Sequence, residues 1–321
     1  LESKSYIDFC FKCIKFIKEK KEKIIFNEHN SFFILLLSKI KRMNTINIYN
    51  LYSLDIQFFI QRGWLEDNNS KISFYHNIVS FKKAFKSFLE RIMAIISSDL
   101  VISNNPCLKK ELIFFKKRTV FINSSISINK YNEANLKSYN FHFNNNYKYI
   151  LYVGNINPEK GLATLIKTYS LLNKTNEYKL ILIGNSSSHE IKWLKSTLKR
   201  YNVTDANYLG KIEHNQLKWF YKNSSIFVLP SFYEGSPRVL KEAMCFSNNI
   251  IASKIPGNLI LDVNQERIKF FTKGDSDDLL NKILELEKVN HIYDKHFVNK
   301  FDSKQIAKDR IKILKDNEFI S

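Results

Sequence analysis

Short apolar runs alternate with longer amphipathic segments through the second half of the chain. An apolar run of four to six residues that ends at a turn residue is typical of a strand buried on both faces, whereas apolar residues three and four apart are typical of a helix. The pattern predicts strands at residues 149–153, 179–183, 207–209, 226–229 and 250–252. It predicts helices at residues 162–172, 190–201, 215–221 and 239–245. Strands that alternate with helices favour a parallel sheet covered on both faces.

The first half carries a weaker version of the same pattern. Strands are expected at residues 23–26, 47–49, 100–102 and 120–122, and helices at residues 31–41 and 81–96. The polar stretch 123–146 is expected to be a linker. We therefore predict an α/β protein with a domain over 1–146 that includes the linker, a second domain over 147–290, and a helical C-terminal segment over 291–321.

Glycine separates the two halves. Seven of the eight glycines lie beyond residue 150, each where a strand ends or a helix begins. Glycine at such points allows positive φ or a close approach of another backbone. In open parallel sheets, ligands bind outside the carboxyl ends of the strands. These glycine loops therefore predict a ligand site in the second half.

The segment 226–245 is the most informative part of the chain. The strand predicted at Ile226–Leu229 ends at Pro230, and Pro237 suits the first position of a helix. Glu234 then lies in the loop and Glu242 inside the helix. The arrangement aims a carboxylate and unpaired backbone N–H groups at one spot, which suits a sugar joined to a phosphate.

Length and composition bound the class of protein. A chain of 321 residues with 44% hydrophobic content has enough core for two domains. No apolar run reaches the roughly 18 residues that span a bilayer, and the first residues do not resemble a secretory signal. The chain begins at Leu1 rather than Met, which suggests a fragment or a trimmed chain. Four cysteines form no disulfide framework at this length, which indicates a reducing, cytoplasmic location.

Two motifs with metal-ligand character favour ordinary structure. Cys10 and Cys13 form a lone C-x-x-C in an amphipathic helical stretch, without a second pair of ligands. Asp275 and Asp277 form a D-x-D that follows Gly274 and opens a predicted helix over 279–286. Helix packing for the first motif and helix capping for the second are favoured over metal binding.

The net charge of +19 has three interpretations. Basic clusters at residues 18–23, 39–42 and 116–118 are compatible with a solvated basic surface, with an anionic membrane surface, or with nucleic acid. Apolar residues interleave with lysines in the first predicted helix and near Lys82, which suits a membrane surface. No RNA- or DNA-binding motif accompanies the charge, so we expect no nucleic-acid partner.

The motifs together resemble glycosyltransferase family 4, whose GT-B fold has two Rossmann-like domains. The resemblance covers residues 148–290 as the donor-binding domain. It rests on the segments 152–161 (YVGNINPEKG), 182–184 (LIG), 208–210 (YLG), 229–235 (LPSFYEG), 242–244 (EAM) and 251–253 (IAS). The first half resembles the acceptor domain at residues 25–29, 98–103 and 120–123, and the family's opening glycine-rich loop and first strands are absent. The expected fold is therefore GT-B with an incomplete N-terminal Rossmann-like domain.

The resemblance implies roles for individual residues. Lys160 would contact the donor diphosphate, Glu234 the hydroxyls of the donor sugar and Glu242 those of the ribose. His29, at the end of an early strand, would act on the acceptor side, which makes Glu234, Lys160 and His29 the catalytic candidates. The remaining donor-binding candidates are Gly154, Asn155, Gly184, Lys211, Gly235, Ser236, Arg238 and Val239, the last two through the backbone that cradles the diphosphate.

The residues also have simpler interpretations, and the family pattern is not matched throughout. Glu242 and Arg238 are four apart on a helix and would form a surface pair, Lys160 would be a solvated loop lysine, and Glu234 a turn residue. Asn155 stands where the family usually has an arginine, and Arg238 is the candidate to supply that charge. Ser247 and Asn249 replace a usual glycine and proline after the Glu242 helix.

The family implies retention of anomeric configuration, without cofactor or metal. The expected function is transfer of a sugar from a UDP- or GDP-sugar to a glycan or lipid-linked saccharide in surface polysaccharide synthesis (capsule or lipopolysaccharide). The expected location is cytoplasmic, with the inner face of the membrane as a peripheral contact. A noncatalytic scaffold that binds nucleotide sugars and a basic nucleic-acid-binding protein are the alternatives.

Overall fold

The structure is a computed structural model in which the chain forms two compact units. It describes residues 24–28, 46–51, 89–105, 108, 112, 118–122, 124–126, 141–144, 146–172, 177–247, 249–264, 266–286 and 301–316. The first unit comprises residues 1–123 with 308–321, and the second comprises residues 124–307.

The first unit contains a four-stranded parallel sheet. Its strands are β1 (Ile24–Glu28), β2 (Ile46–Leu51), β3 (Leu100–Ser103) and β4 (Arg118–Phe121), paired in that order. A helix over residues 89–97 precedes β3, and its Ala94 and Ile95 are buried like all of β3. The four strands and this part of the helix predicted at 81–96 are confirmed. The predicted helix 31–41, Cys10, Cys13 and His29 lie outside the described residues.

The second unit is built on a six-stranded parallel sheet with the order β10-β9-β8-β5-β6-β7. Its strands are β5 (Lys148–Val153), β6 (Tyr178–Ile183), β7 (Asn207–Tyr208), β8 (Ile226–Leu229), β9 (Ile250–Ser253) and β10 (Lys269–Phe271). From β5 the chain runs outward to β7, then returns to the other side of β5 with β8 and continues to β10. The direction of strand addition therefore reverses between β5 and β8, and such a switch point opens a crevice outside the carboxyl ends of the two strands.

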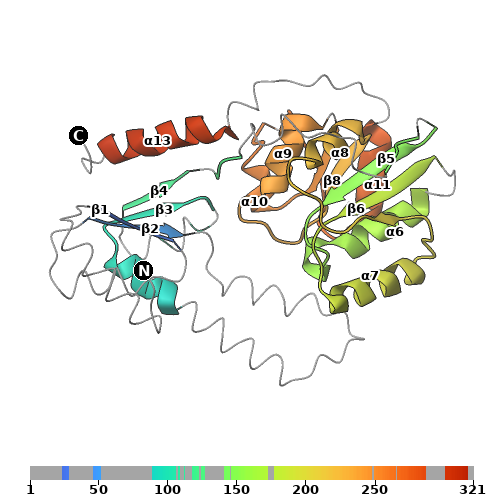
Figure 1. The fold of residues 1–321 in the computed structure, drawn as a ribbon, viewed down its shortest axis with the longest axis horizontal. Helices are drawn as coiled ribbons and strands as arrows, with labels where there is room; N and C mark the ends of the chain where they lie inside the picture. Colours follow the sequence, from blue (N-terminus) through green and yellow to red (C-terminus); the bar gives the residue numbers. More distant parts are fainter. Residues whose placement is uncertain are drawn as a thin grey trace. The chain divides into compact units, whose positions relative to one another are not determined.

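Helices lie on both sides of this sheet (Figure 1). They are α6 (Leu162–Leu172), α7 (Ser188–Arg200), α8 (Leu217–Asn223), α9 (Arg238–Phe246), α10 (Pro256–Leu259) and α11 (Ser276–Leu286), preceded by the 3-10 turn η4 (Pro158–Lys160). Helix α6 packs beside α11, where the Thr168 hydroxyl donates to the Ser276 carbonyl at 2.9 Å, and α8 packs beside α9. The sheet is buried between these layers, as the mostly apolar sequences of β6, β8 and β9 require.

The strands and helices predicted for the second half are confirmed to within a few residues, but the pattern missed the short helix α10 and the strand β10, and it placed the start of α9 one residue early. The sequence pattern missed β10, because this strand has only three residues and begins with the exposed Lys269. Pro237 was predicted as the first helical residue, but its ψ of 117° is extended, so it is the cap and α9 begins at Arg238. A φ of −67° suits proline in either position, which is why the sequence did not distinguish them.

The stretch predicted as a linker, 123–146, is packed at both of its described ends. Ile126 donates its backbone N–H to the Phe301 carbonyl at 2.9 Å. Phe143 lies edge-on to Tyr149 and Trp219, with ring centroids 4.6 and 4.8 Å apart. The division between the units accordingly falls after Asn123 rather than at the expected 146. The C-terminal helix α13 (Ser303–Asp316) lies in the segment expected to be helical, and the division between the units passes through it after Ala307.

Helix capping, rather than metal binding, is the role of the D-x-D motif. Asp275 Oδ1 accepts hydrogen bonds from the backbone N–H groups of Asp277 and Asp278, both at 3.0 Å, at the start of α11. Within the described ranges, no group of three or more histidine, cysteine, aspartate or glutamate side chains is placed to hold a metal ion. Within the same ranges, no helix has the length and apolar character needed to cross a membrane.

Candidate donor-binding site

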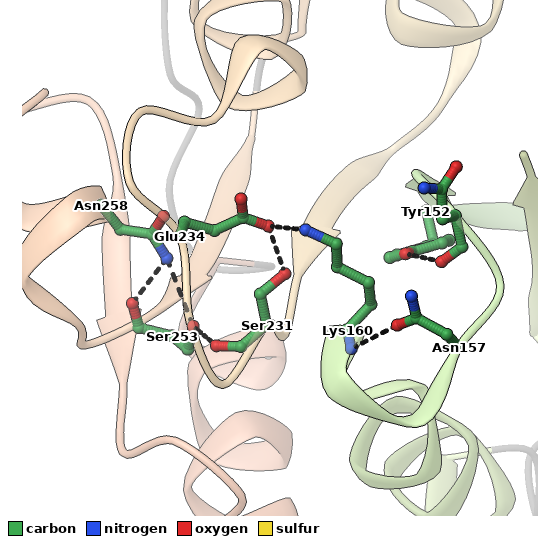
Figure 2. Close-up of polar contacts among 8 residues, drawn as sticks. Tyr152, Asn157, Lys160, Ser231, Glu234, Ser253 and Asn258 are labelled. Carbon is green, nitrogen blue, oxygen red and sulfur yellow. Dashed lines mark hydrogen bonds and ion pairs between the residues drawn. The ribbon is translucent and has the colours of Figure 1, made fainter. Parts of the chain in front are cut away.

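An ion pair lies across the switch point of the second sheet. Lys160 belongs to η4, directly after β5, and Glu234 lies in the loop after β8. Lys160 Nζ is 2.7 Å from Glu234 Oε1, and the two side chains point toward one another (Figure 2). Their side chains are 26% and 12% exposed, so the pair is partly shielded and still reachable from solvent. A single contact thus joins the two loops that flank the expected ligand crevice.

The turn that carries Lys160 is fixed by its own sequence. Asn157 caps η4, since its Oδ1 accepts the Lys160 backbone N–H at 3.1 Å, and Pro158 follows at the first helical position. Gly161 ends the turn in the left-handed region with φ of 69°. A β-carbon at this glycine would stand 1.9 Å from the Pro230 carbonyl oxygen, so only glycine lets the two loops come this close.

The loop that carries Glu234 is held by a chain of hydrogen bonds. Ser231 Oγ donates to Glu234 Oε1 at 2.8 Å, and the Ser231 carbonyl accepts from the Ser253 hydroxyl. Asn258 Nδ2, on α10, donates to the Ser253 carbonyl at 2.9 Å (Figure 2). Glu234 is therefore not a solvated turn residue, because β9 and α10 fix the backbone that presents it.

Gly257 is expected to be essential for the position of this loop. A β-carbon there would lie 1.9 Å from the Glu234 carbonyl oxygen, and backbone atoms do not yield as a flexible side chain does. Gly257→Ala should destabilise the protein by about 1–3 kcal/mol and displace Glu234, so nucleotide binding falls as well. Thermal unfolding and nucleotide titration measure the two effects.

Gly210→Ala is the matched control. Gly210 has a φ of 69°, so alanine there is strained, but nothing lies within 4 Å of its β-carbon position. This variant should lose stability and keep its affinity for nucleotide. Equal nucleotide affinities of Gly257→Ala and the parent protein would contradict the role given to Gly257.

Tyr152, the penultimate residue of β5, supports the loop that follows this strand at the carboxyl edge of the sheet. It is fully buried, and its hydroxyl donates to the Asn155 carbonyl at 2.8 Å. Burial, and secondarily the charge of Glu234, hold the pKa of Tyr152 well above its usual range. The phenol therefore stays neutral and keeps its proton for Asn155, which fixes the loop between β5 and η4.

Glu242 is the second carboxylate of the site and is completely buried. Tyr221 donates to its Oε2 at 3.0 Å, and His214 Nε2 lies 3.1 Å from its Oε1, an ion pair when the imidazole is protonated. Apart from this contact with His214, Oε1 has no hydrogen-bond partner among the described residues, so it keeps acceptor capacity. The simpler interpretation, an exposed pair with Arg238 on the helix surface, is wrong because Glu242 faces the interior.

The N-terminus of α9 follows the Glu234 loop directly. No side chain caps it, since Pro237 occupies the cap position and provides no acceptor there. The first backbone N–H groups of a helix lack partners within the helix and favour a bound anion. Arg238 is exposed at this end. Positive potential from a helix terminus and a guanidinium thus lies beside the Lys160–Glu234 pair in sequence and in fold.

The other predicted donor-binding residues lie along the same carboxyl edge, whereas His29, a catalytic candidate, lies outside the described residues. Gly154 and Gly184 end β5 and β6 and are in contact, since a β-carbon on Gly184 would lie 1.7 Å from the Gly154 carbonyl oxygen. Asn155 follows Gly154, and Lys211 is exposed after β7. Gly235 and Ser236 continue the loop into α9.

Three participants were not identified from the sequence: Ser231, Tyr221 and His214. Ser231 precedes Glu234 by three residues, which is a spacing that a turn-forming serine often has, so its contact had a local signal. Tyr221 and His214 reach Glu242 from α8 and from the loop before it. Only the tertiary fold brings these two residues to the site.

The candidate site thus combines a lysine, two carboxylates and an uncapped helix N-terminus at the carboxyl edge of a doubly wound parallel sheet. A family model described as "Glycosyl transferases group 1" matches residues 136–301, which is more than half of the chain. The chain belongs to this family, and its fold is GT-B.

Individual relatives agree with the assignment. An uncharacterized glycosyltransferase of Methanocaldococcus jannaschii is 25% identical over 276 residues, which are 81% of this chain and 76% of that protein. The capsular polysaccharide biosynthesis glycosyltransferase CapM of Staphylococcus aureus is 28% identical over 251 residues, 70% of this chain and 64% of CapM. Among solved structures, Anabaena HepE in complex with UDP aligns with a TM-score of 0.70 at 18% identity, over 96% of this chain and 82% of HepE.

Proposed function

We propose that the chain transfers a sugar from a nucleoside-diphosphate sugar to a glycan or lipid-linked saccharide in surface polysaccharide synthesis, with retention of configuration at the anomeric carbon. The observation that carries the proposal is the 2.7 Å pair of Lys160 and Glu234 across the switch point. A diphosphate requires cations and unpaired N–H groups, whereas a sugar requires hydrogen-bond acceptors. Lys160 supplies a cation and Glu234 supplies an acceptor, and the two are in direct contact.

The ion pair itself suggests how the donor enters. A diphosphate carries more negative charge than one carboxylate, so it competes with Glu234 for the Lys160 ammonium. Lys160 released from Glu234 would bind the diphosphate, and the Glu234 carboxylate would be free to accept hydrogen bonds from sugar hydroxyls. The same residues would then change partners rather than lose them, which keeps the cost of binding low.

Glu242 is proposed to bind the ribose of the nucleotide. Its Oε2 is held by Tyr221, and Oε1 retains acceptor capacity beneath His214, whose side chain is 42% exposed. Displacement of His214 would open Oε1 to ribose hydroxyls. A buried carboxylate of fixed orientation discriminates strongly, because a ligand that cannot donate to it leaves a charge unpaired.

The transfer step exchanges one bond for another at the anomeric carbon. The bond from this carbon to the diphosphate oxygen breaks, and a bond to the acceptor hydroxyl oxygen forms on the same face. The acceptor proton passes to the departing diphosphate, which acts as the base. Negative charge therefore grows on the diphosphate, where Lys160 and the N-terminus of α9 stabilise it.

The relatives support the choice of donor and pathway class. Anabaena HepE was solved with UDP, which makes a uridine nucleotide one donor to test, with GDP-sugars as the second. CapM is a capsular polysaccharide biosynthesis enzyme by name. A location on the cytoplasmic side of the membrane, with the basic surface against anionic lipid, would suit a lipid-linked acceptor.

Transfer with retention is tested by incubating the protein with UDP-glucose or GDP-mannose and lipid-linked saccharide from bacterial membranes. The expected products are nucleoside diphosphate and a new linkage with the anomeric configuration of the donor, resolved by NMR. An inverted linkage would contradict the mechanism. Binding of the nucleotide sugar without any product would favour the noncatalytic scaffold.

Arg238 is expected to supply the charge that Asn155 does not. Arg238→Ala should weaken binding of UDP or GDP about tenfold, because one cation near the diphosphate is lost. Binding of the uncharged nucleosides should not change. Titration calorimetry measures both, with Arg200→Ala at the distant end of α7 as the control. An unchanged affinity for the diphosphates would contradict this role.

A further inference from the structure

Lys241, on α9, is completely buried. The proposed mechanism does not use this lysine. Its Nζ donates to Ser236 Oγ at 2.7 Å, to Ser124 Oγ at 2.6 Å and to the Ser124 carbonyl at 3.1 Å. These three contacts exhaust the donors of an ammonium, and none is to a carboxylate. Lys241 therefore ties the loop before α9 to the first residue of the second unit with hydrogen bonds alone.

The surroundings of Lys241 disfavour its positive charge. Burial lowers the pKa of Lys241 to about 7, and the nearby Arg238 acts in the same direction. The segment 124–126 brings no titratable group. The Phe301 ring, 5.8 Å from Nζ, makes a cation–π contact that favours the charge and so opposes the effect of burial. Asp302, next to Phe301, accepts the Lys304 backbone N–H, and Glu242 on α9 itself is held by Tyr221.

We propose that Lys241 is a positioning residue for the donor diphosphate. Lys241 orients the Ser236 hydroxyl, and because of Lys241 the binding of the donor takes up a proton. The inference rests on the proposed function, since it assumes that the diphosphate lies at the loop before α9. It adds a residue and a proton to that site.

The direction of one hydroxyl proton explains the orienting effect. As an ammonium, Lys241 donates to Ser236 Oγ and occupies one of its lone pairs, so the serine proton is directed away from Nζ, to the side where the proposal places the diphosphate. There it can donate to a diphosphate oxygen. As a neutral amine, Lys241 has a lone pair that can accept the Ser236 proton, and the hydroxyl then turns inward and no longer serves the ligand.

The same charge links the donor to the proton. A bound diphosphate favours the ammonium, so it raises the pKa of Lys241 above the value of about 7 in the empty site. If the bound form stays protonated to pH 8, donor affinity is about tenfold weaker at pH 8 than at pH 6. At pH 7, where the empty site is half protonated, binding takes up about half a proton.

The test is titration calorimetry with UDP-glucose and GDP-mannose at pH 6, 7 and 8. Both have a diphosphate that is esterified at each end and does not titrate in this range. Repeating the titration at pH 7 in buffers of different ionisation enthalpy gives the number of protons taken up. Lys241→Met removes the charge and keeps an apolar chain in the buried position, whereas Lys241→Arg keeps the charge at every pH. Lys192→Met, on the exposed face of α7, is the control for loss of one lysine.

The wild-type protein and Lys192→Met should show the tenfold decline and the proton uptake. Lys241→Met should bind at all three pH values with an affinity at or below that of the wild type at pH 8, and without this proton uptake. Lys241→Arg should bind the donor with the affinity that the wild type has at pH 6, and this affinity should not change between pH 6 and pH 8. Equal slopes in wild type and Lys241→Met would overturn this inference and leave the proposed function standing. No proton uptake by the wild type would also overturn it, even where Lys241→Met fails to fold. Absence of binding of either nucleotide sugar to the wild type would overturn both.

Discussion

Glu234→Gln is expected to lower the rate of sugar transfer about 100-fold while the protein stays folded. The amide matches the carboxylate in shape but carries no charge, so it binds sugar hydroxyls and the Lys160 ammonium less strongly. Loss of a charge-assisted contact of roughly 2–3 kcal/mol in the transition state corresponds to this factor. Steady-state rates with the nucleotide sugar measure it, and thermal unfolding shows that the fold is retained.

The effect should lie in the sugar-dependent step. Glu234→Gln should bind free UDP or GDP at least as well as the parent, because Lys160 no longer has to leave a carboxylate partner. Glu213→Gln, an exposed residue of the same unit, is the matched control and should retain full activity. A Glu234→Gln variant with the rate of the parent would show that Glu234 only stabilises its loop.

Glu242→Gln should weaken nucleotide binding about 30-fold. The carboxylate is fully buried and oriented by Tyr221, so a ribose that donates two hydroxyls to it forms charge-assisted hydrogen bonds. Replacement by an amide removes about 2 kcal/mol of this interaction. Because the contact is to ribose, binding of UMP or GMP should weaken by the same factor as binding of the diphosphates. Titration calorimetry with the four nucleotides gives the comparison.

The matched comparison is Lys160→Met. Lys160 is proposed to contact the diphosphate, so this variant should lose more affinity for the nucleoside diphosphates than for the monophosphates. Tyr221→Phe removes one donor to Oε2 and keeps the charge of Glu242. Its nucleotide affinity should therefore lie between those of Glu242→Gln and the parent protein. If Glu242→Gln and Lys160→Met each lost as much affinity for the monophosphates as for the diphosphates, the separate roles of the two residues would be contradicted.

The fold of the second unit was predictable because its strands are buried on both faces. A strand such as β8 has four consecutive apolar residues, and its helical neighbour α9 shows the spacing of an amphipathic helix. The short, lysine-led β10 carries too few residues for a pattern. The extent of the second unit was not predictable either, since Ile126 and Phe143 join it through contacts with residues far along the chain.

The positions of the site residues were predictable where the chain itself sets them. Glu234 and Lys160 follow strands β8 and β5, and parallel strands bring their carboxyl ends to one edge. The strand order that makes β5 and β8 neighbours was not readable from the sequence, and it alone creates the 2.7 Å pair. Lys241 is the opposite case: a lysine in an amphipathic helix is ordinarily exposed, and only packing against Ser124 and Phe301 reveals its burial.

Both acidic residues depend on partners that the donor would displace or share. Glu234 is neutralised by Lys160, and Glu242 lies beside His214. In the proposed mechanism the donor's diphosphate takes over the contact of Lys160, and the donor's hydroxyls take over contacts of the two carboxylates. This exchange of partners is the central claim of the proposed mechanism.

Titration of the wild-type protein and Lys160→Met with UDP-glucose and GDP-mannose tests that claim most directly. We predict that one nucleotide sugar binds the wild type at a single site, and that Lys160→Met binds it at least tenfold more weakly although the same variant frees Glu234. Binding that is unchanged or tighter in Lys160→Met would show that the lysine serves only to neutralise Glu234, and the exchange of partners would be wrong.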